Sequence, residues 1–166
     1  VPVTASYIIA AVMIVPALVQ VGVAEVAAHM FVFYYAVLSE VSPPTALSPF
    51  AAAALTGGNP LRTTMLSWKY TAPAFIVPFA FTIDPRGLGL LLQASAGAVA
   101  WSLLTASLGV LAIAVSAAGW IRGAASPLER ALVAVAAALL FVPSPAVALT
   151  GAALLAVVVA VHWRRA

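Results

Sequence analysis

The sequence predicts an all-α integral membrane protein, and two observations support this prediction. Of the 166 residues, 65% are apolar and only 7% are charged, with a mean hydropathy of +1.17. A soluble domain averages about 45–50% apolar and about 25% charged residues. The apolar residues also form long continuous runs bounded by prolines and capping residues. A membrane β-barrel would instead alternate polar and apolar residues in strands of about 10 residues.

Composition excludes several classes of function. The seven basic residues are scattered singly or in one pair, whereas a nucleic-acid-binding face needs clustered Lys and Arg, so no nucleic-acid partner is expected. The sequence has no Cys, which excludes disulfides, thiol nucleophiles and Cys-ligated metals. The chain starts at Val1-Pro2-Val3 without a basic leader, so we expect no signal peptide and interpret the sequence as part of a longer one.

Prolines and charged residues divide the chain into apolar segments that we expect to be helices: 5–20, 25–57, 64–83, 88–121, 128–142 and 146–163. Asn59-Pro60 is typical of an N-cap followed by Pro at the first helical position. Ser126-Pro127-Leu128-Glu129 has the pattern of a capping box, and Ser144-Pro145 repeats the placement of Pro. Segment 88–121 is too long for one straight span, so 96–121 is expected to cross the membrane and 88–95 to follow its surface.

Basic residues predict the orientation, because they concentrate on the cytoplasmic side of membrane proteins. With the turn 57–62 inside, only Arg86 falls outside, and the inner set is Arg62, Lys69, Arg122, Arg130, Arg164 and Arg165. Tryptophans beside these residues, Trp68, Trp120 and Trp163, have the pattern of an interfacial belt. We therefore expect a multi-pass protein with a cytoplasmic C-terminus.

Segment 25–57 contains an interruption near the expected bilayer midplane, Ser39-Glu40-Val41-Ser42-Pro43-Pro44-Thr45. Two successive prolines remove two amide donors and disfavour the helical conformation of the residues before them. The helix is therefore expected to stop near Val41 and to restart at Pro43, with Ser42 as N-cap. Irregular backbone at this depth is tolerated where it is buried in protein or lines a wet cavity. A simple kink in a packed helix is the alternative.

The chemistry of such an interruption follows from the two helix ends. Free carbonyls at the end of 25–41 would suit a small cation such as Na⁺, and free amides from Pro43 onward would suit a carboxylate. The hydroxyls of Ser39, Ser42 and Thr45 would add oxygen ligands. Pro2 and Thr4 look like a second helix start, so segment 5–20 either spans the membrane or forms the returning arm of a re-entrant hairpin.

Four motifs in the first half of the chain are distinctive: Pro2–Tyr7, Ala28–Tyr35, Leu38–Leu47 and Gly58–Thr63. Together they resemble the large membrane subunit of tripartite ATP-independent periplasmic (TRAP) transporters, and within that family the fused permeases that work with TAXI-type substrate-binding proteins. The family's usual Thr-Pro-Pro-Val is here Ser42-Pro43-Pro44-Thr45, which keeps a hydroxyl at the interruption.

The resemblance implies an elevator-type, Na⁺-coupled importer of organic acids in the cytoplasmic (inner) membrane of a bacterium or archaeon. Residues 1–83 would form the C-terminal part of the permease domain, with the returning arm of the second-repeat re-entrant hairpin and its discontinuous helix. Residues 84–166 would be additional C-terminal transmembrane helices. The implied partners are a periplasmic TAXI-type binding protein, the remainder of the permease, the small-subunit helices and membrane lipid.

On this reading Na⁺ is the coupling ion and no cofactor is expected. The expected ion-binding residues are Ser39, Glu40, Val41, Ser42 and Thr45, and the expected substrate-facing residues are Pro2, Thr4, Pro43 and Pro44. A charge at the membrane centre costs at least about 2.5–3.5 kcal/mol on insertion scales, so Glu40 is expected to serve ion or proton coupling, with a structural hydrogen bond as the alternative.

Two other functions compete with transport. A scaffolding membrane subunit without transport activity is the main alternative, although a scaffold has no need of a polar interruption at midplane. An intramembrane enzyme is disfavoured, because no general base lies near the midplane serines. Glu25 and His29 share a helix face and are interpreted as a surface pair or a docking anchor. A metal site would need a third ligand, and His162 is expected at the opposite membrane face.

Overall fold

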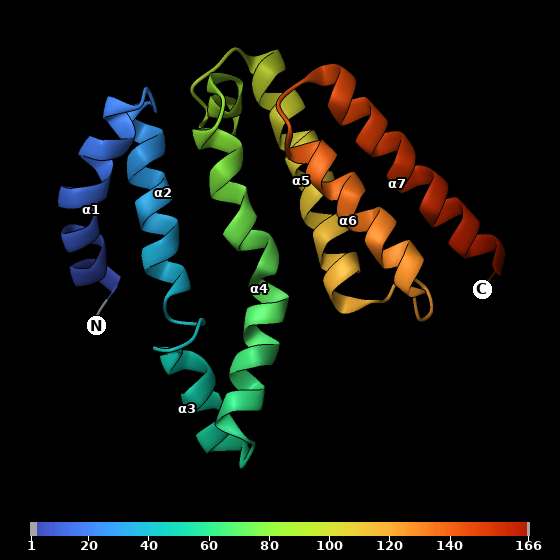
Figure 1. Ribbon diagram of the computed structural model, residues 1–166, viewed down its shortest axis with the longest axis horizontal. Coiled ribbons are helices and arrows are strands. Elements are labelled where there is room, and N and C mark those ends of the chain that lie inside the picture. The colour runs from blue at the N-terminus through green and yellow to red at the C-terminus, as the bar shows by residue number, and fades with distance from the viewer. Residues whose placement is uncertain (1–2, 166) are drawn as a thin grey trace. The chain divides into compact units, whose positions relative to one another are not determined.

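The computed structural model describes residues 3–165, whose regular structure is helical (Figure 1). The elements are α1 (Val3–Gln20), α2 (Glu25–Leu38), α3 (Leu47–Thr56), α4 (Pro60–Thr82), the 3₁₀ helix η1 (Pro85–Leu91), α5 (Ala96–Ala118), α6 (Pro127–Phe141) and α7 (Pro145–Arg165). The predicted all-helical class is confirmed. Three helices, α1, α5 and α7, are long and apolar enough to cross a membrane. The expected span 64–83 lies in α4, which has 23 residues but is not one of these three.

Helix starts agree with the capping signals in the sequence. The side-chain oxygen of Asn59 accepts a hydrogen bond from the amide of Arg62 at 3.0 Å, and α4 begins at Pro60. The capping box before α6 is complete: Ser126 Oγ accepts from the amide of Glu129 at 3.3 Å, and Glu129 Oε2 accepts from the amide of Ser126 at 2.8 Å. These bonds satisfy amides that the first helical turn leaves without partners.

The interruption in segment 25–57 is wider than expected. The prediction that the first half-helix stops near Val41 and the second restarts at Pro43 with Ser42 as N-cap is wrong, since α2 ends at Leu38 and α3 begins at Leu47. Before the prolines, the amides of Glu40 and Val41 each bond three residues back, which ends the α-helical pattern. After them, Ala46 has a left-handed conformation with φ 34°, which delays the new helix to Leu47.

Segment 88–121 divides close to the predicted boundary. The 3₁₀ helix η1 precedes α5, and Leu92 between them has a left-handed φ of 60°. The amides of Leu92 and Gln93 both bond back into η1, which closes this turn. Helix α5 ends at Ala118 rather than residue 121 because Gly119 adopts φ 73° and caps it.

Residues up to Thr82 form one compact unit and residues from Ile83 form a second. In the first unit α1 and α2 lie side by side, with Val15, Ala28 and Val32 buried between them (Figure 1). Helix α4 contacts both α2 and α3. Its Phe79 packs edge-on against Phe31 at 5.5 Å between ring centroids, so aromatic stacking holds α4 to α2.

The second unit is a bundle in which α6 packs against both α5 and α7. Its buried core contains Ala112, Val133, Ala137 and Val158. Small residues allow the helices to approach closely: a Cβ at Gly151 would lie 2.9 Å from the carbonyl oxygen of Ala136. Close backbone approach at small residues is typical of helix packing in membranes, where burial of apolar side chains gives little driving force.

Candidate functional site

The candidate site is the non-helical segment 39–46 between α2 and α3 (Figure 1). The hydroxyl of Ser39 donates to the carbonyl of Ala36 at 2.7 Å, and the hydroxyl of Thr45 donates to the carbonyl of Ser39 at 2.7 Å. Each hydroxyl therefore has its proton engaged by the backbone, and its oxygen lone pairs remain able to bind a cation. Ser39 is half-buried and Thr45 is exposed.

Backbone carbonyls of segment 39–46 differ in whether a hydrogen bond already engages them. The carbonyl of Glu40 accepts from the amide of Ser48 at 3.2 Å, and that of Ser42 accepts from the amide of Ala46 at 3.0 Å. Within residues 3–165 no hydrogen bond engages the carbonyl of Val41. Uncharged oxygens from hydroxyls and unwound carbonyls are the ligands used for Na⁺ in broken membrane helices.

The start of α3 offers fewer amides than the sequence suggested. The amide of Ser48 is bonded to Glu40, that of Phe50 is bonded to the carbonyl of Ala46 at 3.2 Å, and Pro49 has no N–H. Among the first four residues of α3, only Leu47 then has an amide without a recorded partner in the described chain. Between Pro43 and Phe50, the amides without a partner in the described chain are those of Thr45 and Leu47, which is fewer than the sequence suggested.

The expected site residues fall into separate places. Ser39, Ser42 and Thr45 are brought together, because the Thr45 hydroxyl also lies 3.4 Å from the carbonyl oxygen of Ser42. Glu40 and Val41 are half-buried in the same segment, and within residues 3–165 no hydrogen bond or ion pair engages the Glu40 carboxylate. The substrate-facing candidates Pro43 and Pro44 are exposed, and Pro2 lies outside the described residues.

Thr4 lies on α1 in a different cavity, of about 400 Å³, together with Tyr7 and His29. Ser39 instead lines a cavity of about 250 Å³ between α1 and α2, together with Ser6 and Tyr35. The structure therefore places one hydroxyl of the interruption beside α1 and does not place Thr4 with it. Nδ1 of His29 lies 2.8 Å from the phenol oxygen of Tyr7, and the part of the chain that the structure describes has no ion pair between His29 and Glu25.

Comparison with known families bears on this first unit. The model of the family described as "Tripartite ATP-independent periplasmic transporter, DctM component" matches residues 1–86. This is more than half of the chain, and it contains α1 to α4 and the interruption. The chain belongs to this family. Comparisons with curated proteins and with solved structures give no match.

Membership in the DctM family makes the chain a membrane component of a TRAP transporter and not a member of an enzyme family. With three apolar helices of spanning length, it is a multi-pass membrane protein. TRAP components work together with a substrate-binding protein and other subunits. The interruption between α2 and α3 therefore belongs to the part of the chain that carries the family identity.

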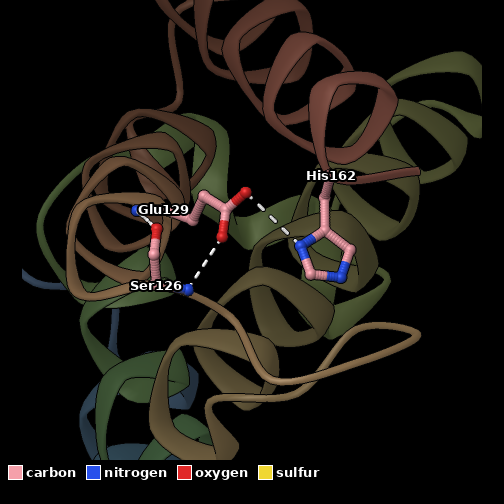
Figure 2. Close-up of polar contacts among 3 residues, drawn as sticks. All are labelled: Ser126, Glu129 and His162. Carbon is pink, nitrogen blue, oxygen red and sulfur yellow. Dashed lines mark hydrogen bonds and ion pairs between the residues drawn. The ribbon is translucent and has the colours of Figure 1, made fainter. Parts of the chain in front are cut away.

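A second polar cluster lies in the other unit, beyond the family match, and sequence reasoning missed it. Figure 2 shows the Glu129 carboxylate between Ser126 and His162, with Oε1 at 3.4 Å from Nδ1 of the imidazole. Both side chains are buried. Hydrogen bonds from the backbone and side chain of Ser126, and then from His162, lower the pKa of Glu129, which lies in the first turn of α6 before the apolar run from Ala131.

One signal in the sequence pointed to this cluster. The capping box fixes Glu129 at the start of α6, and His162 lies in the last turn of α7. A tight turn at Pro143-Ser144 joins these neighbouring helices, so the start of one meets the end of the other. The pairing itself depends on helix rotation, which the sequence pattern does not define.

Proposed function

We propose that this DctM-family chain forms part of a Na⁺-coupled secondary importer of organic acids. A periplasmic binding protein of the TAXI type would deliver the acids to it. The observation that carries the proposal is the polar, non-helical segment 39–46 within the family-matched region. A broken helix with uncoordinated oxygens is the usual construction of an ion site in secondary transporters.

The proposed Na⁺ ligands come from Ser39, Glu40, Val41, Ser42 and Thr45. The hydroxyl oxygens of Ser39 and Thr45 and the carbonyl of Val41 are the best supported of these, because their lone pairs are not consumed by the hydrogen bonds of the described chain. The carboxylate of Glu40 supplies the negative charge that would balance the cation. The carbonyl of Ser42 is already an acceptor, so its contribution would be its hydroxyl.

Substrate contact is proposed for Pro2, Thr4, Pro43 and Pro44. The exposure of Pro43 and Pro44 and the two amides left open between Pro43 and Phe50 in the described chain, those of Thr45 and Leu47, support a small contact surface here rather than a complete carboxylate site. Other groups that bind the acid would then come from the rest of the permease. This division agrees with a transporter whose substrate site is shared between two repeats.

The domain boundaries, the topology and the other partners are part of the same proposal. Residues 1–83 would belong to the transport domain, with α1 as the returning arm of a re-entrant hairpin and α2–α3 as the discontinuous helix of an elevator-type transporter. Residues 84–166 would be additional membrane helices. Six of the seven basic residues fall on the expected inner side, which supports a cytoplasmic C-terminus in the inner membrane, and the small-subunit helices would be further partners.

The test is uptake of labelled small carboxylates by proteoliposomes that contain the complete permease, with its binding protein outside. We expect uptake to need both an inward Na⁺ gradient and the binding protein. Thr45→Val should raise the Na⁺ concentration for half-maximal uptake by about tenfold, because one ligand is lost. Thr56→Val is the matched control, since its exposed hydroxyl donates to the carbonyl of Ala52 within α3.

Glu40→Gln tests the charge at the interruption, with Glu25→Gln as the exposed control. Uptake that persists without Na⁺ and without the binding protein would overturn the proposal. Unchanged Na⁺ dependence in both Thr45→Val and Glu40→Gln would overturn the assignment of the ion site. A chain that supports no uptake but is needed for the other subunits to assemble would instead be a structural subunit.

A further inference from the structure

The second unit contains a cavity that the transport proposal does not use. It has a volume of about 630 Å³ and lies where the turn after α5 meets the start of α6 and the end of α7. Arg122, Ser126, Glu129, His162 and Arg165 line it. All of these residues belong to the compact unit from Ile83 onward, so the cavity lies within one unit.

His162 is the buried group that points to a ligand. The residue is 5% exposed, and its Nδ1 faces Glu129 at 3.4 Å. Its Nε2 is buried and has no hydrogen-bond partner among residues 3–165. Figure 2 shows the imidazole held on one side by Glu129, with Nε2 on the far side of the ring. A buried polar atom without a partner is destabilising, so a ligand in the cavity would satisfy it.

A glycine lies next to Nε2. A Cβ added at Gly123 would meet Nε2 at 4.0 Å and no other atom within that distance. The turn that carries Gly123 is closed by two backbone hydrogen bonds, from Ala125 to the carbonyl of Gly119 at 2.9 Å and from Ile121 to the carbonyl of Gly123 at 3.2 Å. The turn thereby fixes the backbone that carries Arg122 at the edge of the cavity.

The charge of the cavity is positive. Arg122 and Arg165 are exposed at its edge, and within the described residues neither forms an ion pair. Glu129, the only acid among the described residues that line it, already accepts from the amide of Ser126 and contacts His162. In the tautomer that donates from Nδ1 to ionised Glu129, Nε2 carries a proton only in the imidazolium form. An anion at Nε2 would then be favoured together with that proton.

We propose that this cavity binds a phosphate group, held by Nε2–H of His162 and the guanidinium groups of Arg122 and Arg165. Guanidinium groups match the geometry of phosphate oxygens, and basic pockets between membrane helices bind phospholipid head groups. Trp120 and Trp163, beside these arginines, are 61% and 60% exposed, as tryptophans at a membrane surface are. The phosphate is therefore that of an anionic phospholipid or free inorganic phosphate.

The test uses the full chain purified in detergent and titrated with short-chain phosphatidylglycerol, phosphatidylcholine or sodium phosphate, with bound ligand measured by native mass spectrometry. We expect phosphatidylglycerol to bind, and Arg122→Gln and Arg165→Gln each to weaken binding by about tenfold. Arg164→Gln is the matched control, because it removes the same charge from the adjacent residue, which does not line the cavity. An equal loss in Arg164→Gln would overturn the proposal.

The competition arm distinguishes the two sources of phosphate. If inorganic phosphate at millimolar concentration leaves bound phosphatidylglycerol in place, the ligand is a lipid head group. If inorganic phosphate displaces the lipid from the wild type, and Arg122→Gln weakens phosphate binding as much as it weakens lipid binding, the ligand is free phosphate. Equal binding of phosphatidylglycerol and phosphatidylcholine, with no binding of inorganic phosphate, would overturn the site.

A pH series tests the role of His162. A phosphodiester keeps one negative charge between about pH 6 and pH 8, the interval in which imidazole titrates, so a change in affinity must come from the protein. Within residues 3–165, the charged groups that line the cavity with His162 are Glu129 on α6, Arg122 on the turn and Arg165 on α7, and α5 has no titratable residue. We expect weaker lipid binding as pH rises in the wild type and no such change in His162→Phe. A pH dependence that persists in a folded His162→Phe would exclude the histidine as a ligand.

Discussion

The phenol oxygen of Tyr7 lies 2.8 Å from Nδ1 of His29, which joins α1 to α2 across 22 residues of sequence. The buried core of this interface is apolar and consists of Val15, Ala28 and Val32. Apolar contacts of similar size allow two helices to slide or rotate against each other, whereas a hydrogen bond is directional. The Tyr7–His29 contact therefore helps to fix the register of the two helices.

Replacement of this contact should weaken the first unit. Tyr7→Phe removes the hydroxyl and leaves the ring, so the free energy of unfolding should fall by about 0.5–1.5 kcal/mol, the usual value of one hydrogen bond. The measurement is unfolding of the full chain in detergent, followed by circular dichroism. Tyr70→Phe is the control, because the Tyr70 ring is exposed on α4. An equal effect of the two variants would show that the Tyr7 hydroxyl does not stabilise the helix pair.

The close contact at Gly151 predicts a sharp difference between two glycines. A Cβ at Gly151 would lie 2.9 Å from both the carbonyl oxygen of Ala136 and the Cβ of Leu139, so α6 and α7 must separate in Gly151→Ala. Overpacking of this kind costs about 1–3 kcal/mol. A Cβ at Gly97 meets nothing within 4 Å, so Gly97→Ala should stabilise α5 by up to about 1 kcal/mol. Thermal unfolding midpoints that move in the same direction in both variants would contradict this packing.

Ala46 should respond to substitution according to its backbone conformation. It has φ 34° and ψ 43°, a left-handed conformation that costs an L-residue about 1–2 kcal/mol relative to the right-handed helix. Ala46→Gly should therefore be neutral or stabilising by up to about 1 kcal/mol. Ala46→Val should destabilise strongly, because a β-branched residue is disfavoured at positive φ and the site is fully buried. The same unfolding assay checks both variants, and greater stability in Ala46→Val than in Ala46→Gly would refute the assigned conformation.

Glu129 should make the second unit sensitive to acid. Its pKa is lowered in the folded chain by the hydrogen bonds of Ser126 and His162, so the folded state favours the ionised carboxylate. That stability is present above the pKa of the unfolded chain, about 4.3 for Glu, and is lost as the pH falls through the lower folded value. Glu129→Gln should reduce the loss of thermal stability between neutral pH and pH values below about 4. Glu25→Gln should leave it unchanged, and an acid response identical to the wild type in Glu129→Gln would contradict the prediction.

Local signals accounted for most of the elements. Asn59-Pro60 and the capping box Ser126–Glu129 predicted helix starts correctly, because a cap depends on residues within one turn. The width of the interruption was not predictable from Pro43-Pro44 alone. Where α3 begins depends on the left-handed conformation of Ala46, and a buried Ala is not a residue that usually signals such a conformation.

The candidate site, too, was predictable from the sequence only in part. The sequence identified the hydroxyl oxygens of Ser39 and Thr45 as cation ligands. In the structure the Thr45 hydroxyl donates to the carbonyl of Ser39, which joins the two residues. The sequence did not foresee that the Ser48 amide bonds to the carbonyl of Glu40 across the turn, or that the Phe50 amide is engaged by the carbonyl of Ala46 one helical turn earlier. Thr4 lines a different cavity from Ser39, which depends on how α1 is rotated against α2.

The sequence by itself determined that this is a helical membrane protein that resembles the TRAP permeases, with a helix interrupted around Pro43-Pro44. Hydropathy, caps and proline act over a few residues, so they can be interpreted without a fold. Only the tertiary structure decided that His29 pairs with Tyr7 and that His162 pairs with Glu129. Such pairs depend on the rotation and register of packed helices, and many rotations bury similar apolar area in a chain this rich in small residues.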